Sequence, residues 1–275
     1  MQRNVLLGAV LTGLALCAAA FPAAAESLAE VVAKVEGNPT RNPPCTEIVL
    51  DPAVPGVRPF GRCAVNIVGS LYLGLLRDRE RLAVLRDAIA QQRQVLAAQQ
   101  RYVEGGGSSE SDLLLAEVEL KRWQLREAEL VGAVLHAELF FATTMESDPE
   151  AFARPSLDPE AWPESEATAL AALAQYDKLP EDERQALELT LQHAWIDYRA
   201  ARRTLDLLEP MQAFTHDIAQ ASMQKYEIAQ LSFPTLLNFL RENSNLRERL
   251  VVTQYRALAL QFHILELLQR REALQ

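Results

Sequence analysis

Two stretches of this sequence, YVEGGGSSESDLL at residues 102–114 and YEIAQLSFPTLL at residues 226–237, are two copies of one pattern. Each copy contains a tyrosine, a small residue, a serine, an aspartate or threonine, and then a pair of leucines. The copies align in register if the first contains one extra glycine. Because each copy lies between two long helical patterns, the repeat predicts two helical hairpins of related design.

This repeat resembles that of the outer-membrane efflux protein family, the TolC-like exit ducts of Gram-negative bacteria. The family's repeat is a tyrosine, a glycine three residues later, a serine, and then Asp-Leu-Leu before an alanine-rich helix. The first copy matches with Asp112 and the residues LLLAE that follow it, and the second has Ala229 at the glycine position and Thr235 at the aspartate position. The resemblance covers about residues 75–145 and 185–270.

The first 25 residues have the features of a secretory signal peptide. Arg3 precedes an apolar run at residues 5–16, and a triplet of alanines precedes Glu26. We expect cleavage after this triplet, because small residues mark such sites and the run is too short to anchor the chain in a bilayer. Lipid attachment at Cys17 would require a small residue in place of Leu16, so we expect no lipid anchor.

The charge of the exported chain excludes some partners. Residues 1–25 contain one basic and no acidic residue, so the remainder has 26 basic and 37 acidic residues and a net charge of −11. This excess of acid argues against binding to nucleic acid or to anionic lipid. No other apolar stretch reaches the length that spans a membrane.

Three segments divide the chain after the signal peptide. We expect a first helical-hairpin repeat at 26–145, a linker rich in proline and acidic residues at 146–163, and a second repeat at 164–275. The first repeat begins with a short helix at 27–35 and continues with a Pro-rich loop at 39–68. Short strands at residues 47–50 and near 65–68 are possible within this loop.

Two cysteines, Cys45 and Cys63, remain after the signal peptide and flank a segment rich in Pro and Gly. Disulfides persist in exported proteins, so we expect a bridge between them. A bridge that closes such a loop would stabilise the fold by about 3 kcal/mol in the chain-entropy model. The alternative is that they are two unrelated buried thiols.

Four long helices follow from the apolar periodicity. They are expected at about 71–104, from Ser109 or Ser111 to about 144, from 181 through Pro210 to 226, and in the last limb beyond the second turn. The second helix has an apolar stripe of Leu114, Val118, Leu125, Ala128, Gly132, Leu135 and Leu139. The fold class is therefore all-α: long antiparallel coiled-coil hairpins in two repeats, a TolC-like α-barrel subunit with little or no β-structure. Alanine-rich stripes give a thin core, so we expect a homo-oligomer.

The sequence contains no pattern that predicts an enzyme. None of the four histidines has a glutamate three residues before it, so the Glu-x-x-His signature of di-iron bundles is absent. No strand precedes the glycine triplet at 105–107 and no lysine follows it, so it is not a phosphate loop. We expect no catalytic residue, no cofactor and no metal site.

The resemblance implies a function in efflux. Family members are homotrimers whose six hairpins form a helical tube, and their hairpin ends meet a periplasmic adaptor protein linked to an inner-membrane transporter. The residues expected to make this contact are Gly105, Gly106, Gly107, Ser109, Ala229, Gln230 and Ser232. The simpler interpretation is that these residues only form the turns.

One departure from the family leaves a second function open. Family members also contribute two pairs of membrane strands, yet only residues 179–183 separate the short from the long helix in the second half. Residues 46–72 have room for one irregular pair at most. The alternative is therefore a periplasmic coiled-coil structural or interaction protein without channel activity. In both cases we expect an exported protein of the outer membrane or periplasm of a Gram-negative bacterium.

Overall fold

The computed structural model describes residues 26–36, 63–156, 162–173 and 180–268. The expected signal peptide, Cys45 and the possible strand at 47–50 lie outside these residues. The described helices are α1 (Leu28–Glu36), α2 (Cys63–Glu104), α3 (Glu110–Thr144), the 3-10 helix η1 (Pro149–Ala151), α4 (Glu166–Ala172), α5 (Glu181–Glu227) and α6 (Phe233–Leu267). The only β-pairing in the described ranges is an isolated bridge between Glu26 and Phe152.

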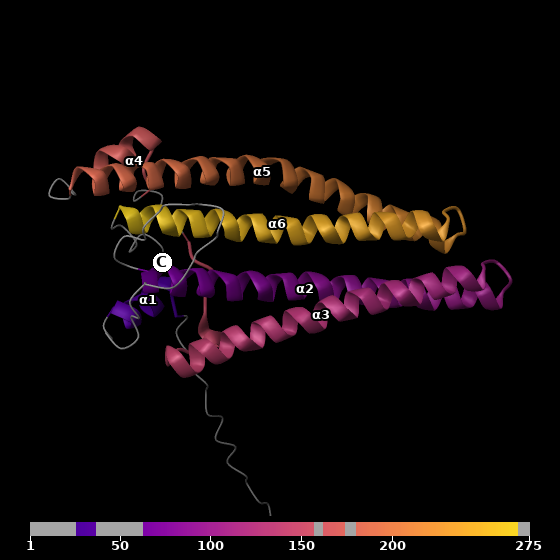
Figure 1. Ribbon diagram of the computed structural model, residues 1–275. Coiled ribbons are helices and arrows are strands. Elements are labelled where there is room, and N and C mark those ends of the chain that lie inside the picture. Colours follow the sequence, from indigo (N-terminus) through magenta and orange to yellow (C-terminus); the bar gives the residue numbers. More distant parts are fainter. Residues whose placement is uncertain (1–25, 37–62, 157–161, 174–179, 269–275) are drawn as a thin grey trace, which may run out of the picture.

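Four long helices lie side by side in a single row, in the order α5, α6, α2, α3 (Figure 1). The inner helices α6 and α2 each pack against two neighbours, whereas α5 and α3 form the edges of the row. Both hairpin turns lie at one end, which we call the tip end. The small helices α1 and α4 cover the opposite end, which we call the base. This architecture confirms the all-α class of long antiparallel hairpins.

Helix α2 begins earlier than the sequence indicated. It starts at Cys63, so residues 65–68 are helical and the strand that was possible there does not form. Val68 lies on the buried face of this helix. Together with Tyr72, one turn later, it packs against α1 in the core at the base. β-branched residues favour strands only weakly, and packing against α1 and α6 overrides that preference.

The other helix ends follow local chemistry. Ser27 and Glu30 form a capping box at the start of α1, with Ser27 N donating to Glu30 Oε2 at 2.7 Å and Glu30 N to Ser27 Oγ at 3.3 Å. Pro210 lies inside α5, which continues to Glu227 and curves toward α6 in Figure 1. A proline removes one helical hydrogen bond and bends a long helix without ending it when the apolar pattern continues.

The core is a thin layer along the row. At the base, α1, α2, α3 and α6 bury a cluster that includes Tyr72, Phe141 and Leu265. Gly69 permits the close approach of α2 and α6 there, because a Cβ at this position would collide with the ring of Phe262. Toward the tip end, α2, α3, α5 and α6 bury a second cluster around Val95, Ala116 and Leu236.

Candidate partner-contact site at the hairpin tips

Two backbone hydrogen bonds end α2 at the turn that leads to α3. Gly107 N donates to Tyr102 O at 2.7 Å and Gly106 N to Val103 O at 3.0 Å, which is the Schellman pattern of helix ends. Gly106 has a φ of 71°, a left-handed conformation that glycine adopts without steric cost. The glycine triplet therefore ends α2 as predicted.

The turn between α5 and α6 repeats this geometry without any glycine. Gln230 N donates to Lys225 O at 2.8 Å and Ala229 N to Tyr226 O at 3.0 Å, and Ala229 has a φ of 58°. Ala229 thus corresponds to Gly106. Ala229 is the third residue after its repeat tyrosine, Tyr226, whereas Gly106 is the fourth residue after Tyr102. The expected extra residue of the first copy therefore precedes its left-handed residue.

The two repeat tyrosines hold the turns together. The Tyr102 hydroxyl lies 2.9 Å from Tyr226 O and 2.8 Å from Glu227 O, two carbonyls at the end of α5. In the opposite direction, the Tyr226 hydroxyl donates to Oε1 of the buried Gln99 on α2. The two rings meet edge to face, with centroids 5.3 Å apart. Burial is the main reason why the pKa of Tyr226 is raised to about 12, so this hydroxyl remains a donor.

The returning helices begin at equivalent serines. Ser109 Oγ accepts from Asp112 N at 3.2 Å and donates to the Asp112 carboxylate at 2.9 Å, so Ser109, and not Ser111, caps α3. Ser232 precedes α6 and lies 2.8 Å from the Thr235 hydroxyl, but its side chain makes no capping bond to the backbone. The serine and the aspartate or threonine of the repeat thus contact each other in both turns.

The structure brings all the predicted contact residues to the tip end. Gly105, Gly106, Gly107, Ser109, Ala229, Gln230 and Ser232 are all exposed. Their common location agrees with two hairpins of one design. Sequence reasoning missed Ile228, whose side chain is 63% exposed beside Ala229. The available signal was an isoleucine in a turn, where a polar residue is usual.

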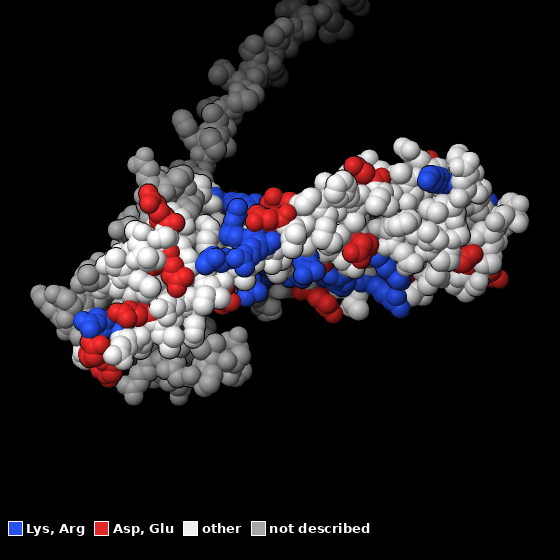
Figure 2. Space-filling view, turned by 90° about the horizontal axis from the view of Figure 1, so that it is seen from above, with Lys and Arg blue, Asp and Glu red and all other residues white. Residues whose placement is uncertain are grey.

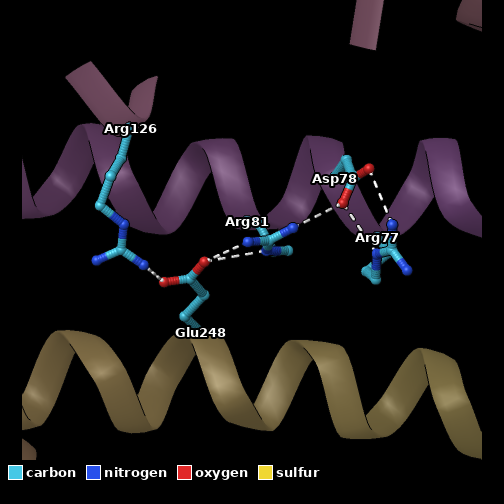
Figure 3. A network of polar contacts seen from close by, with 5 residues as sticks. All are labelled: Arg77, Asp78, Arg81, Arg126 and Glu248. Atoms are coloured by element: carbon cyan, nitrogen blue, oxygen red, sulfur yellow. Dashed lines mark hydrogen bonds and ion pairs between the residues drawn. The ribbon is translucent and has the colours of Figure 1, made fainter. Parts of the chain in front are cut away.

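Ion pairs between buried acids and partly exposed arginines join the two hairpins. Figure 3 shows Glu248 of α6 between two arginines, Arg81 of α2 and Arg126 of α3. Arg81 Nη2 lies 2.6 Å from the Glu248 carboxylate, and Arg81 also binds Asp78 at 3.1 Å. Asp78 in turn binds Arg77 at 2.9 Å.

A second buried acid, Glu119, also connects the two hairpins, but here the acid is on α3 and its arginine partner is on α6. Arg241 of α6 donates to it from both Nε and Nη2, and Arg122 donates from α3 at 2.6 Å. Burial alone would raise the pKa of Glu119, but the hydrogen bonds and charges of Arg241 and Arg122 outweigh it and lower this pKa below its usual value. Charged side chains at these positions were not identified from the sequence, because no local spacing connects residues on α3 and α6.

The predicted apolar stripe of α3 faces away from the core. Its bulky members, Leu114, Val118, Leu125, Leu135 and Leu139, are all exposed. Helix α3 packs by the opposite face, with Ala116, Leu120, Trp123, Leu130, Val134 and Phe141. The expectation that this stripe contributes to the core is wrong: α3 has two apolar faces, and within the described residues only the other face packs against neighbouring helices.

Helix α5 has the same property at the other edge of the row. One stripe is buried and contains Leu187, Leu191, Ala194, Ala201, Leu205 and Leu208. A second stripe is exposed and consists of Leu189, Ile196, Leu207, Met211, Phe214 and Ile218. In Figure 2, which looks down on the α5 edge, few charged side chains cover the half of the molecule that leads to the tips.

Other kinds of site find little support in the described ranges. No cluster of three or more His, Cys, Asp or Glu side chains that would suit a metal ion occurs there. Nor does any helix in this part of the chain combine the length and hydrophobicity needed to cross a membrane. Cys63 is the first residue of α2, and its expected disulfide partner Cys45 lies outside the described residues, so the bridge stays a prediction.

Comparisons with known proteins identify the fold. No protein-family model matches the sequence, and no curated protein matches it. Among solved structures, the outer-membrane channel OprN superposes with a TM-score of 0.58 at 14% identity, over 73% of this chain and 65% of that one. The outer-membrane channel CmeC of Campylobacter jejuni gives a TM-score of 0.54 at 12% identity, over 75% of this chain and 62% of that one.

The chain therefore shares the fold of these outer-membrane channels over the matched region, as the resemblance of its repeat implied. It spans less than two thirds of the length of either channel.

Proposed function

We propose that the protein is a subunit of a TolC-like efflux duct, a passive exit path in the outer membrane or periplasm of a Gram-negative bacterium. The observation that carries this proposal is the pair of exposed apolar stripes on the two edges of the helix row. A row of four helices with two exposed apolar edges can bind further copies of itself at each edge. Contacts between the edges of neighbouring copies would close such rows into a tube. The fold shared with two outer-membrane channels supports the same conclusion.

The occupant of each edge is a second copy of this chain. Leu125 lies fifteen residues past the start of α3, and Met211 lies sixteen residues before the end of α5, so both are about 23 Å from the tip end. The stripes of α3 and α5 therefore meet at the same height when two copies stand side by side with their tips aligned. The two helices run in opposite directions, as neighbours within each hairpin also do.

Three copies would close the tube, as the resemblance implies. Each copy would supply its two repeats, at residues 26–145 and 164–275, and thus four of twelve helices. In an isologous dimer, the same edge of both copies would be in contact. Contact between the α3 edge of one copy and the α5 edge of the next is head-to-tail, and such contacts generate a ring.

The tips would meet a periplasmic adaptor protein that connects the duct to an inner-membrane transporter. Seven exposed residues at one end support this role: Gly105, Gly106, Gly107, Ser109, Ala229, Gln230 and Ser232. Exposed Ile228 would add an apolar anchor, because the fully buried centre of a protein interface is more apolar than the surface around it. Cys45 and Cys63 would form their disulfide after export, where the environment is oxidising.

Cysteine crosslinking tests the contact between copies. The double variant Leu125→Cys with Met211→Cys, oxidised in whole cells, should give covalent species of two and three chains on a non-reducing gel. Ala213→Cys in place of Met211→Cys is the matched control, because Ala213 is exposed on a different face of α5. Equal crosslinking by both pairs, or none by either, would contradict the proposed edge contact.

Mass photometry in mild detergent gives an independent readout. Phe214→Arg on the exposed stripe should convert the oligomer to monomers, and Ala213→Arg should not. A wild-type protein that is monomeric and folded at micromolar concentration would overturn the duct. Release of the protein by osmotic shock, without detergent, would favour a periplasmic interaction protein instead.

Photocrosslinking in cells tests the tip contact. A photoreactive amino acid at Gln230 or Gly107 should capture the adaptor, and the same amino acid at the exposed Glu209 of α5 should not. Capture from all three positions alike, or from none, would reduce the tip residues to a turn-forming role.

A further inference from the structure

The row of four helices is curved, and α2 lies on its convex side. In the row α2 stands between α3 and α6, yet two ion pairs join α3 and α6 directly. Arg126 of α3 reaches Glu248 of α6, and Figure 3 shows its side chain passing across α2. Arg241 of α6 donates from Nε to Glu119 of α3 at 3.1 Å. Because α2 would otherwise separate these side chains, it lies behind the line that joins α3 and α6.

The exposed sides of the helices agree with this curvature. Ala90 of α2 is exposed, whereas Arg81, nine residues earlier and so on the opposite side of the helix, binds Glu248. Asn245 of α6 lies four residues after Arg241 and three before Glu248, so it adjoins the ion pairs to α3. Past its first turn α6 exposes one strip that contains Asn245: Asn238, Glu242, Asn245, Arg249, Val252 and Arg256. This strip and the neighbouring ion pairs form the concave face of the row.

Arginines outnumber acids in the ion pairs of the concave face. Each acid is shared by two arginines. The residues are Arg77, Arg81, Arg122, Arg126 and Arg241 with Asp78, Glu119 and Glu248. They have an excess of two positive charges, in a chain of net charge −10. The arginine side chains are 28–64% exposed and the acids only 3–15%, so the guanidinium groups lie between the carboxylates and the solvent.

The other charged residues of the concave face do not reverse this excess. On the α6 strip Arg249 balances Glu242, and Arg256 lies 3.7 Å from Asp197 of α5. Glu129 of α3 is exposed seven residues after Arg122, on the same side of the helix, and subtracts one charge. The face therefore keeps one positive charge, and its most deeply buried charges are the negative ones.

We propose that the concave face is the inner wall of the duct and that its arginines favour the passage of anionic solutes. The inference rests on the proposed function, because the passage exists only when copies close into a ring. Curved rows that join edge to edge enclose their concave side. Rings of arginine or lysine side chains select anions in pores, and low-dielectric walls concentrate the field of such charges.

Shielding from a large probe tests the location of this face. Asn245→Cys on the α6 strip and Ala90→Cys on the back of α2 are each labelled with biotin maleimide in the full chain, purified as an oligomer in mild detergent. Twelve helices about 10 Å apart enclose a space roughly 30 Å wide, which is too narrow for streptavidin. Streptavidin should therefore capture at least tenfold more of the biotin at position 90 than at position 245.

The monomer provides the control for this comparison. In the Phe214→Arg background, which should be monomeric, streptavidin should capture both biotins equally. Equal capture from an oligomer would overturn the inner wall and leave the ring standing. A wild-type protein without any oligomer in mass photometry would contradict the ring, and with it the passage.

Charged thiol reagents test the preference for anions. In the oligomer, Asn245→Cys is treated at low ionic strength with an anionic methanethiosulfonate that carries a sulfonate and with a cationic one that carries trimethylammonium. Peptide mass spectrometry follows each cysteine separately, and the same cysteine in urea gives the intrinsic rates. The normalised ratio of anionic to cationic rates should be at least threefold higher at position 245 than in Ala213→Cys, which is exposed on α5. An equal or lower ratio would overturn the preference for anions.

Removal of one arginine locates the source of this preference. Arg249→Gln, one turn from position 245, should lower the ratio about threefold, because one charge changes the rates of the two reagents in opposite directions. Arg93→Gln is the matched control, since Arg93 is exposed three residues after Ala90 on the convex side, and it should leave the ratio unchanged. Equal effects of the two variants would show that the reagents respond only to the overall charge of the chain, which would contradict the arginine-lined wall.

Discussion

The two hairpin turns have the same backbone and different surroundings. Gly106 and Ala229 both adopt a left-handed conformation, although an alanine there costs about 1–2 kcal/mol. The second turn is followed by a buried leucine pair, Leu236 and Leu237, whereas Leu114 of the equivalent first pair is 56% exposed. This difference indicates that packing of the start of α6 stabilises the left-handed alanine of the second turn. The first turn needs less packing of the helix that follows, because glycine adopts the left-handed conformation without steric cost.

The largest effect is expected where the two hairpins are joined. Arg241→Leu should reduce the free energy of unfolding by about 3 kcal/mol, because it removes the partner that neutralises buried Glu119 from across the interface. Arg122→Leu is the matched control and should cost less than about 1 kcal/mol, because Arg122 is 64% exposed. Urea unfolding followed by circular dichroism measures both, and equal losses would contradict the cross-hairpin role.

The same pair predicts a dependence on pH. The pKa of Glu119 is lower in the folded than in the unfolded protein, so its contribution to stability is present above the unfolded value and is lost as pH falls through the folded value. Wild type should therefore lose stability in acid. Arg241→Leu should show a smaller loss between pH 7 and acid, and an identical pH profile of the two proteins would argue against this assignment.

The two repeat tyrosines should differ in importance. Tyr226→Phe should cost about 2 kcal/mol, because it leaves the amide of fully buried Gln99 without its donor. Tyr102→Phe should cost about 1 kcal/mol, because the carbonyls that it contacts lie at an exposed helix end where water can replace the hydroxyl. Thermal unfolding of the two variants gives the order, and a reversed order would contradict this account.

Exchanging the left-handed residues should change stability in opposite directions. Gly106→Ala should destabilise by about 1 kcal/mol, although no atom lies near the added Cβ, because only backbone conformation opposes it. Ala229→Gly should stabilise by about 0.5–1 kcal/mol for the same reason. If both substitutions shift the urea midpoint in the same direction, the turns are not equivalent.

The smallest single effect is expected at Ser232, one of the two serines that precede the returning helices. Ser109→Ala should cost about 1 kcal/mol because it removes a hydrogen bond to Asp112 N, whereas Ser232→Ala should cost a few tenths, because Ser232 makes no such bond. Urea unfolding of both variants measures the difference. Equal losses would indicate that the Ser232 hydroxyl caps α6 in solution.

Several parts of the fold were predictable because they depend on local chemistry. The glycine triplet, the capping box at Ser27 and the continuation of α5 through Pro210 follow from backbone preferences and from periodicity. The location of both turns at one end follows from the repeat itself. The tip residues could therefore be named from the sequence, apart from Ile228.

The features that were missed depend on contacts between distant segments. The start of α2 at Cys63 depends on packing against α1 and α6. The exposed face of α3 could not be told from its buried face, because both are apolar and periodicity does not say which one meets a neighbour. The pairing of Glu119 with Arg241 spans more than a hundred residues, so no local spacing could indicate it.

The first turn has one more residue than the second between its repeat tyrosine and its left-handed residue, so the two hairpin tips are not equivalent. If the repeats were identical, a closed ring of hairpins would present the same tip at every position around its rim. Because Tyr102 lies one residue farther from Gly106 than Tyr226 does from Ala229, two kinds of tip would alternate around the proposed ring. A partner that binds once per chain can use one kind only, whereas a partner present at every tip has to recognise two different shapes.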